Sequence, residues 1–185
     1  MKKILTIAVL MALFSCGQQQ SAVQETAAVP DAVGAGQSAV NDPDSAPNVV
    51  QVAVGSKDHT TLVAAVKAGE LVDALSNAGP FTVFAPTNAA FEKLPAGTVE
   101  NLLKPENKAS LQDILQYHVY VGVISETMVQ DGMKLNQVNG GDVVLNKKDG
   151  KITINGANVL GSVKASNGIV YVIDAVLLPP APATK

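Results

Sequence analysis

Residues 81–91 read FTVFAPTNAAF, and this segment combines a strand, a strand terminator and a helix start. Its first five positions alternate so that Phe81 and its partners face one side of a strand and Phe84 faces the other. Pro86 has no backbone N–H to donate to a neighbouring strand, so it ends the strand. Thr87 can then cap a short helix by accepting a hydrogen bond from a backbone N–H, and that helix points Phe91 inward.

The sequence on either side of this segment divides into a helical part and a strand part. Apolar residues recur at helical spacing between residues 62 and 75 and again between residues 99 and 115. Later apolar runs are separated by turn pairs, which are Asn139-Gly140, Asp149-Gly150, Asn155-Gly156 and Asn167-Gly168. Residues 169–173 are apolar on both faces and predict a central, covered strand. Helices first and strands later indicate an α+β fold.

Three motifs of the chain resemble the fasciclin domain family. They are residues 81–91, residues 167–179 (NGIVYVIDAVLLP) and the pair Tyr117-His118 between them. Residues 98–107 (TVENLLKPEN) are also similar to bacterial members. The resemblance covers essentially the whole folded part of the chain. It implies a single α+β fasciclin-like domain, in which a helical N-terminal half packs on a meandering, mostly antiparallel β-sheet or wedge.

The first residues have the features of a bacterial export signal. Two Lys residues precede an apolar run from Ile4 to Phe14, which is too short to span a bilayer and has the size of a signal-peptide core. Residues 13–17 read LFSCG, which is similar to a lipobox. This similarity implies that Cys16 carries lipid. Cys16 is the only Cys in the chain, so it can form no intramolecular disulfide.

We therefore expect four parts in the chain. Residues 1–15 are a lipoprotein signal peptide, and residues 16–47 are the lipidated Cys16 followed by a disordered tether. Residues 48–180 are the fasciclin-like domain, and residues 181–185 are a C-terminal tail. The expected location is the bacterial cell envelope, where lipid on Cys16 holds the exported protein on a membrane, facing the periplasm or the cell surface.

Composition argues against nucleic acid as a partner. All thirteen basic residues are Lys, and the formal net charge is −3. A chain without Arg lacks the bidentate guanidinium that suits phosphate, and this chain also lacks the basic surface of a nucleic-acid-binding protein. We expect no nucleic-acid partner.

The residues also give no indication of catalysis. The sequence contains no G-x-S-x-G, H-E-x-x-H, P-loop or calcium-loop motif. Its two His residues, His59 and His118, have no Cys at zinc-ligand spacing. We predict no enzyme activity, no catalytic residue, no metal site and no cofactor. His59 is expected to be solvated beside a helix start, and Asp174 to be a buried carboxylate tied by backbone hydrogen bonds.

Tyr117 and His118 are the candidate binding residues. In animal fasciclin domains this pair, flanked by apolar residues, is linked to cell-adhesion receptors, and residues 119–121 supply that flank here. The alternative is that both residues belong to the core, because the helical spacing from Leu111 directs His118 inward. Both interpretations remain open at the level of sequence.

The resemblance implies a non-catalytic binding or adhesion module that contacts an extracellular protein or polysaccharide. Animal members also carry an Asp-Ile pair before the last strand, implicated in integrin contact. The corresponding residues here are Ser162 and Val163, so contact by that route is not expected. The alternative function is an envelope domain that binds a small molecule or lipid in a cleft between helices and sheet.

Overall fold

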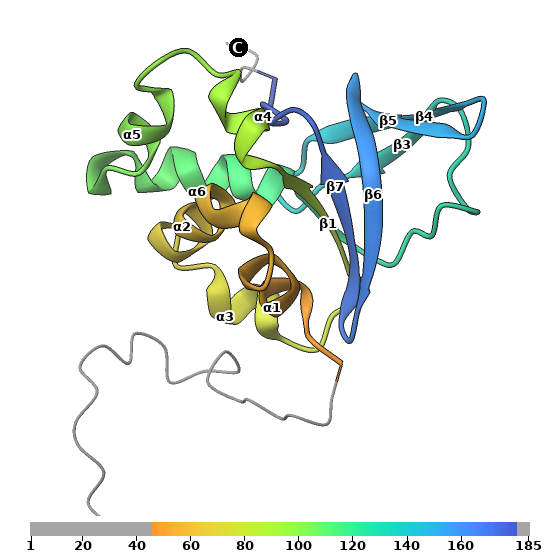
Figure 1. Cartoon of the computed structure of the whole chain (residues 1–185), viewed down its shortest axis with the longest axis horizontal. Helices are drawn as coiled ribbons and strands as arrows, with labels where there is room; N and C mark the ends of the chain where they lie inside the picture. The colour runs from red at the N-terminus through yellow and green to blue at the C-terminus, as the bar shows by residue number, and fades with distance from the viewer. Residues whose placement is uncertain (1–45, 181–185) are drawn as a thin grey trace, which may run out of the picture. The chain divides into compact units, whose positions relative to one another are not determined.

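A layer of helices packs on a seven-stranded sheet in residues 46–180, the part of the chain that the computed structural model describes (Figure 1). The α-helices are α1 (Val49–Val54), α2 (Thr60–Ala68), α3 (Val72–Ser76), α4 (Asn88–Glu92), α5 (Thr98–Leu102) and α6 (Lys108–Tyr117). Short 3₁₀ helices lie at Lys57–His59 (η2) and Pro105–Asn107 (η3). The strands are β1 (Phe81–Pro86), β2 (Val119–Val121), β3 (Met133–Asn136), β4 (Asp142–Lys148), β5 (Lys151–Ile154), β6 (Ala157–Ala165) and β7 (Gly168–Ile173).

The strand order is β2-β1-β7-β6-β5-β4-β3. β1 and β7 run parallel, with Phe81 opposite Gly168 and Pro86 opposite Ile173. Every other neighbouring pair in this sheet is antiparallel. The two motifs that flank the chain's middle therefore lie side by side (Figure 1). The predicted α+β fold, with a helical first half and a mostly antiparallel sheet, is confirmed.

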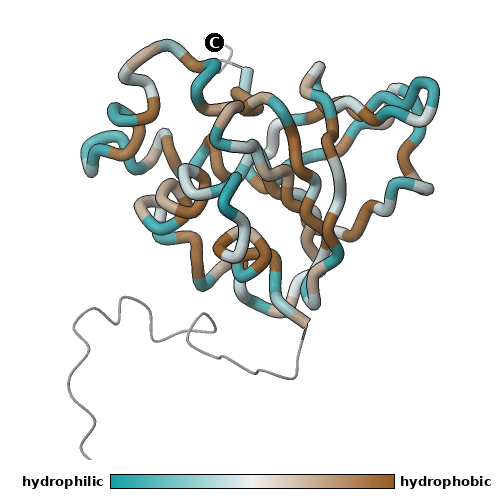
Figure 2. Tube along the Cα trace, viewed as in Figure 1, coloured by the Kyte–Doolittle hydropathy of each residue, from teal (hydrophilic) through white to brown (hydrophobic). Residues whose placement is uncertain are grey.

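The two faces of β1 belong to different hydrophobic clusters. Phe84 packs with side chains of β3, β4, β5 and β7, while Ala85 on the opposite face packs with α1, α2 and α6. Because the first cluster contains residues from both halves of the sheet, the sheet bends back and encloses this core. In Figure 2 the apolar positions follow the inner strands and helix faces, and the β4–β5 turn is hydrophilic.

Two of the predicted hairpin turns form as expected. Asp149-Gly150 and Asn155-Gly156 have positive φ angles of 50° and 78°, and of 47° and 89°. These are the left-handed conformations that tight hairpins require.

The last predicted turn is shifted by one residue. The turn between β6 and β7 consists of Ser166 and Asn167, while Gly168 already pairs as the first residue of β7. A Cβ atom on Gly168 would overlap the carbonyl oxygen of Phe81. Glycine is needed at this position because the β1 backbone approaches it closely, and not because a turn needs a positive φ.

Asn167 ties the β6–β7 turn to the helices. Its Oδ1 accepts a hydrogen bond from the Val49 N–H at 2.9 Å. Its Nδ2 donates to the carbonyl oxygens of Leu75 at 2.9 Å and Asn77 at 2.8 Å. One side chain thus fixes the start of α1 and the end of α3 against the turn.

Candidate functional site

Tyr117 is the last residue of α6, and its side chain lies inside the protein with 1% exposure. Its hydroxyl donates to the carbonyl oxygen of Asp142 at 2.8 Å and accepts from Asn155 Nδ2 at 2.9 Å. Gly141 lies against the tyrosine ring, where a Cβ atom would come within 2.8 Å of it. Tyr117 therefore joins the end of α6 to β4 and to the β5–β6 turn.

His118 follows Tyr117 and is 3% exposed. Its Nδ1 lies 2.8 Å from the carbonyl oxygen of Ile114, and its Nε2 accepts the N–H of Leu177 at 3.0 Å. Because a carbonyl can only accept, the proton of the neutral ring lies on Nδ1. Burial lowers the pKa of His118 to about 4, against the raising effect of the Ile114 carbonyl. The ring is neutral near pH 7, and both of its nitrogens are engaged.

Tyr117 and His118 are adjacent in the sequence, but their side chains pack in different parts of the protein. Tyr117 belongs to the strand-side cluster, whereas His118 borders the helical layer. Both side chains are buried, so neither offers a surface to a partner in this structure, and a binding role for the pair stays a prediction.

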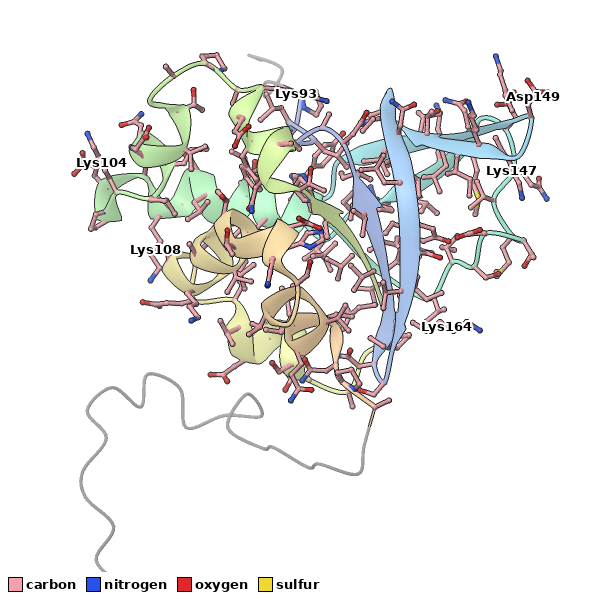
Figure 3. All side chains as sticks on the ribbon, viewed as in Figure 1. Lys93, Lys104, Lys108, Lys147, Asp149 and Lys164 are labelled. Atoms are coloured by element: carbon pink, nitrogen blue, oxygen red, sulfur yellow. The ribbon has the colours of Figure 1, made fainter. Side chains whose placement is uncertain are left out.

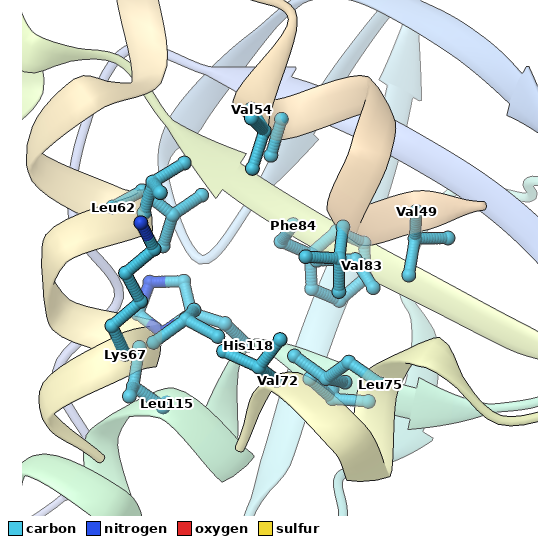
Figure 4. Close-up of a pocket in the computed structure, with 15 residues that line it drawn as sticks. Val49, Val54, Leu62, Lys67, Val72, Leu75, Val83, Phe84, Leu115 and His118 are labelled. Atoms are coloured by element: carbon cyan, nitrogen blue, oxygen red, sulfur yellow. The ribbon is translucent and has the colours of Figure 1, made fainter. Parts of the chain in front are cut away.

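A pocket of about 80 Å³ lies between the helices and β1, and we call it the helix pocket. Val and Leu side chains of α1, α2 and α3 line it, with Val83 and Phe84 of β1 and Leu115 of α6 (Figure 4). Lys67 and His118 are the lining residues with a polar side chain. Exposed Val54 and Lys67 mark its opening to solvent.

A second cavity of about 20 Å³ lies on the other side of His118. Leu62, Leu115 and His118 line both spaces. His118 therefore stands between two incompletely filled regions of the helical layer. Sequence reasoning offered a cleft between helices and sheet only as part of an alternative function. It did not identify the lining residues of either space, since these have the same apolar periodicity as ordinary core residues.

A wide, shallow depression of about 500 Å³ lies beside the β6–β7 turn, and we call it the hairpin hollow. Its lining comes from residues 78–80 before β1, from Val123 and Ser125 after β2, and from residues 164–169. Val123 is 43% exposed, and Lys164 projects outward beside this turn (Figure 3). The hollow combines apolar, hydroxyl, amide and cationic groups in a surface that is open to solvent.

The remaining polar candidates lie apart from these spaces. His59, expected to be solvated, is only 5% exposed, and its Nδ1 lies 2.8 Å from the Ser56 hydroxyl at the start of α2. Burial lowers its pKa, against the raising effect of the neighbouring Asp58 charge. The Ala85 backbone also raises this pKa, although Nε2 has no hydrogen bond of standard geometry to any of residues 46–180.

Asp174 was expected to be buried, but its side chain is 27% exposed. It does accept hydrogen bonds, from the backbone N–H and the side-chain Nδ2 of Asn158, each at 2.8 Å. Lys93 Nζ lies 3.9 Å from its carboxylate. The hydrogen bonds from Asn158 lower the pKa of Asp174, and this carboxylate therefore fixes the end of β7 to β6 from the surface.

The described residues hold neither a metal-binding cluster nor a membrane-spanning helix. Between residues 46 and 180, no group of three or more His, Cys, Asp and Glu side chains is placed to hold a metal ion. In that same range, no helix has both the length and the apolar character needed to cross a membrane. The predicted lipid site at Cys16, the signal peptide and most of the tether lie outside the described residues.

Comparison with known proteins gives consistent similarities. Residues 57–179 match the model of the fasciclin domain. The chain is 55% identical over 138 residues to protein sll1483 of Synechocystis sp., covering 74% of this chain and 76% of that protein. It is 46% identical over 112 residues to the cell surface glycolipoprotein MPB83 of Mycobacterium bovis, covering 60% of this chain and 49% of that protein.

A solved structure shows the same fold. It is the FAS1 domain pair of the insect cell adhesion molecule fasciclin I, with a TM-score of 0.64 and 20% sequence identity. The similarity covers 71% of this chain and 51% of that one.

Proposed function

This chain belongs to the fasciclin domain family, and we propose that it is a lipid-anchored, non-catalytic binding or adhesion module that contacts a protein or polysaccharide outside the cytoplasm. The family membership expected from residues 81–91, Tyr117-His118 and residues 167–179 is confirmed by the match over residues 57–179.

The observation that carries the proposal is the 46% identity to a mycobacterial protein named as a cell surface glycolipoprotein. The lipobox-like LFSCG at residues 13–17 supports the lipid anchor on Cys16. Two or three acyl chains on that residue hold a protein firmly on a membrane, whereas one chain binds only marginally. The roughly 30 residues between Cys16 and α1 would hold the domain about 30 Å from the lipid if they form a flexible coil.

The hairpin hollow is the surface that best suits a macromolecular partner. It is wide, open and chemically mixed, as the rims and patches of protein interfaces are. The hydrogen bonds of Asn167 with α1 and with the end of α3 hold one edge of the hairpin hollow in a fixed shape. Contact through Tyr117 and His118 would instead break their buried hydrogen bonds, so we place the first contact at the hollow.

The test compares single and clustered copies of the protein. We expect the soluble mature chain with Cys16→Ser to bind extracellular matrix or cell-surface polysaccharide weakly, and beads that carry it densely to adhere strongly, because later contacts form at high effective concentration. Beads that carry an unrelated acidic domain serve as the control. Equal adhesion of the two bead types would contradict the adhesion proposal.

A pair of surface variants locates the contact. Val123→Glu places a charge in the hairpin hollow, and Val138→Glu places the same charge at an exposed valine outside it, the two valines being 43% and 47% exposed. We expect Val123→Glu to reduce bead adhesion and Val138→Glu to leave it unchanged. If Val138→Glu alone reduces adhesion, or if neither variant does, the contact surface lies outside the hairpin hollow.

A further inference from the structure

The helix pocket has one polar group that is free to hold a ligand. The imidazole of His118 is neutral, and both of its nitrogens already bond to the backbone at Ile114 and Leu177. No Asp or Glu is among the lining residues. Lys67 is therefore the lining residue that can offer a charged group, from an exposed side chain at the opening of an otherwise apolar pocket.

Lys67 is not neutralised by the carboxylate nearest to it in sequence. Glu70 is held by Lys108, whose Nζ lies 2.6 Å from the Glu70 carboxylate. Neither of the ion pairs found among residues 46–180 involves Lys67. Figure 4 shows the Lys67 side chain along the wall of the pocket, beside Leu62 and His118. A cation placed at the opening of an apolar pocket is complementary to an anionic head on an apolar body.

The size of the pocket limits what the apolar body can be. Its volume of about 80 Å³ is roughly half that of an engineered apolar cavity of about 150 Å³ that binds benzene. It is too small for a whole lipid or a folded peptide segment. It suits the end of one unbranched chain, whose remainder lies along the opening between Val54 and Lys67.

We propose that the helix pocket binds a medium-chain carboxylate, with the end of the alkyl chain between α1, α2 and β1 and the carboxylate beside Lys67. This binding activity is separate from adhesion, because the helix pocket and the hairpin hollow share no lining residue. The charge of Lys67 selects the anionic head, and the Val and Leu side chains select the alkyl chain.

The test uses the mature chain with Cys16→Ser and a series of straight-chain carboxylates from acetate to dodecanoate, each kept below its micelle concentration. Methyl NMR spectra report which Val and Leu side chains change on titration. We expect the changes to be confined to pocket residues such as Leu62, Val66 and Leu75. Affinity should rise about fourfold for each methylene buried and then level off once the pocket is full.

Three variants and one competing probe separate the parts of the proposal. Lys67→Met should weaken decanoate binding about twofold to fivefold, as expected for loss of an exposed ion pair, and Lys104→Met on the distant α5–η3 segment should not. Ala53→Leu, which adds bulk inside the pocket, should weaken binding of every chain length. Decyltrimethylammonium, with the same tail and a positive head, should bind more weakly than decanoate.

Several results would overturn the proposal. They are equal binding of the anionic and cationic probes, unchanged decanoate affinity in Lys67→Met, shifts centred on the hairpin hollow, and affinity that rises through dodecanoate without levelling. Shifts centred on the hairpin hollow would indicate binding at that surface, and the other results would indicate adsorption on a general apolar surface. The Lys67 result decides the question even if Ala53→Leu does not fold. Bead adhesion, measured separately, should be unchanged in Lys67→Met.

Discussion

Removal of the His118 side chain is the sharpest test of how the centre of the protein is held together. His118 links the end of α6 to the C-terminal segment, because it donates to the Ile114 carbonyl and accepts from the Leu177 N–H. We expect His118→Ala to lower the free energy of unfolding without loss of the fold. The size of the effect follows from the hydrogen bonds and from the two cavities on either side of the ring.

Two costs contribute to the expected loss. A buried N–H at Leu177 without a partner costs about 1–3 kcal/mol. The space left by the ring would join the cavities of about 80 and 20 Å³, so neighbouring side chains can fill it only partly. Truncations of large buried side chains to Ala cost about 2–5 kcal/mol. Since the two costs overlap, we expect a total loss of about 3–5 kcal/mol near pH 7.

The same side chain gives stability a pH dependence with a defined sign. The pKa of His118 is about 4 in the folded protein, below its ordinary value of 6.5. The unfolded chain therefore takes up a proton that the folded chain resists as the pH falls below 6.5. The free energy of unfolding is therefore highest above pH 6.5 and decreases as the pH falls towards 4. The decrease due to His118 is about 2 kcal/mol between pH 7.5 and pH 5. His118→Ala should lose this contribution, whereas the contribution of His59, whose pKa burial also lowers, remains.

Chemical denaturation at pH 7.5 and pH 5 measures both effects. Ser110→Ala, on the exposed side of the same helix, is the matched control and should stay within about 0.5 kcal/mol of the original chain. An unchanged midpoint and slope for His118→Ala at pH 7.5 would refute the structural role of the ring. A pH dependence identical to that of the original chain would refute the assignment of the proton to His118.

Three further outcomes are expected. Gly168→Ala should unfold the domain or cost several kcal/mol because its Cβ would overlap Phe81, whereas Gly161→Ala, which meets open space, should cost little; thermal unfolding of both variants distinguishes them. Cys16→Ser should block lipidation and leave the precursor unprocessed or released from the membrane, and normal membrane retention after a high-salt wash would contradict the lipid anchor. Mild proteolysis should cut first within residues 17–47 and leave a stable core, so a first cut between residues 49 and 178 would contradict an exposed tether.

The local elements of the fold were predictable where short-range chemistry determines them. Pro86 ends β1, and Thr87 Oγ1 accepts from the Ala90 N–H at 3.3 Å, as the sequence indicated. Asp149-Gly150 and Asn155-Gly156 form turns because the positive φ they favour is a property of those residues. Each of these features depends on residues that are adjacent in the chain.

Features that depend on distant residues were not predictable. Asn167-Gly168 has the composition of a turn, yet Gly168 is needed against Phe81 and Asn167 is needed by the helices. His59 is buried because the surrounding chain folds over it, and nothing in its local sequence shows this. The helix pocket depends on how completely apolar side chains fill the space between layers. Hydrophobic periodicity identifies which side chains are inside but does not measure the gaps between them.

The parallel pairing of β1 with β7 has a consequence for the order in which the chain can fold. β7 lies between β1 and β6, so the centre of the sheet stays open until residues 168–173 are available. During synthesis the N-terminal residues are made first, so the helices and β1 are present before β7. The apolar side chains of Val83 and Phe84 then stay uncovered until almost the last residues of the chain have been made. Pairing across such a long loop is intrinsically slow. Pairing of β7 is therefore the last step of folding. Loss of a few residues from the C-terminal end of the domain would lower the free energy of unfolding far more than loss of the same number from the N-terminal segment.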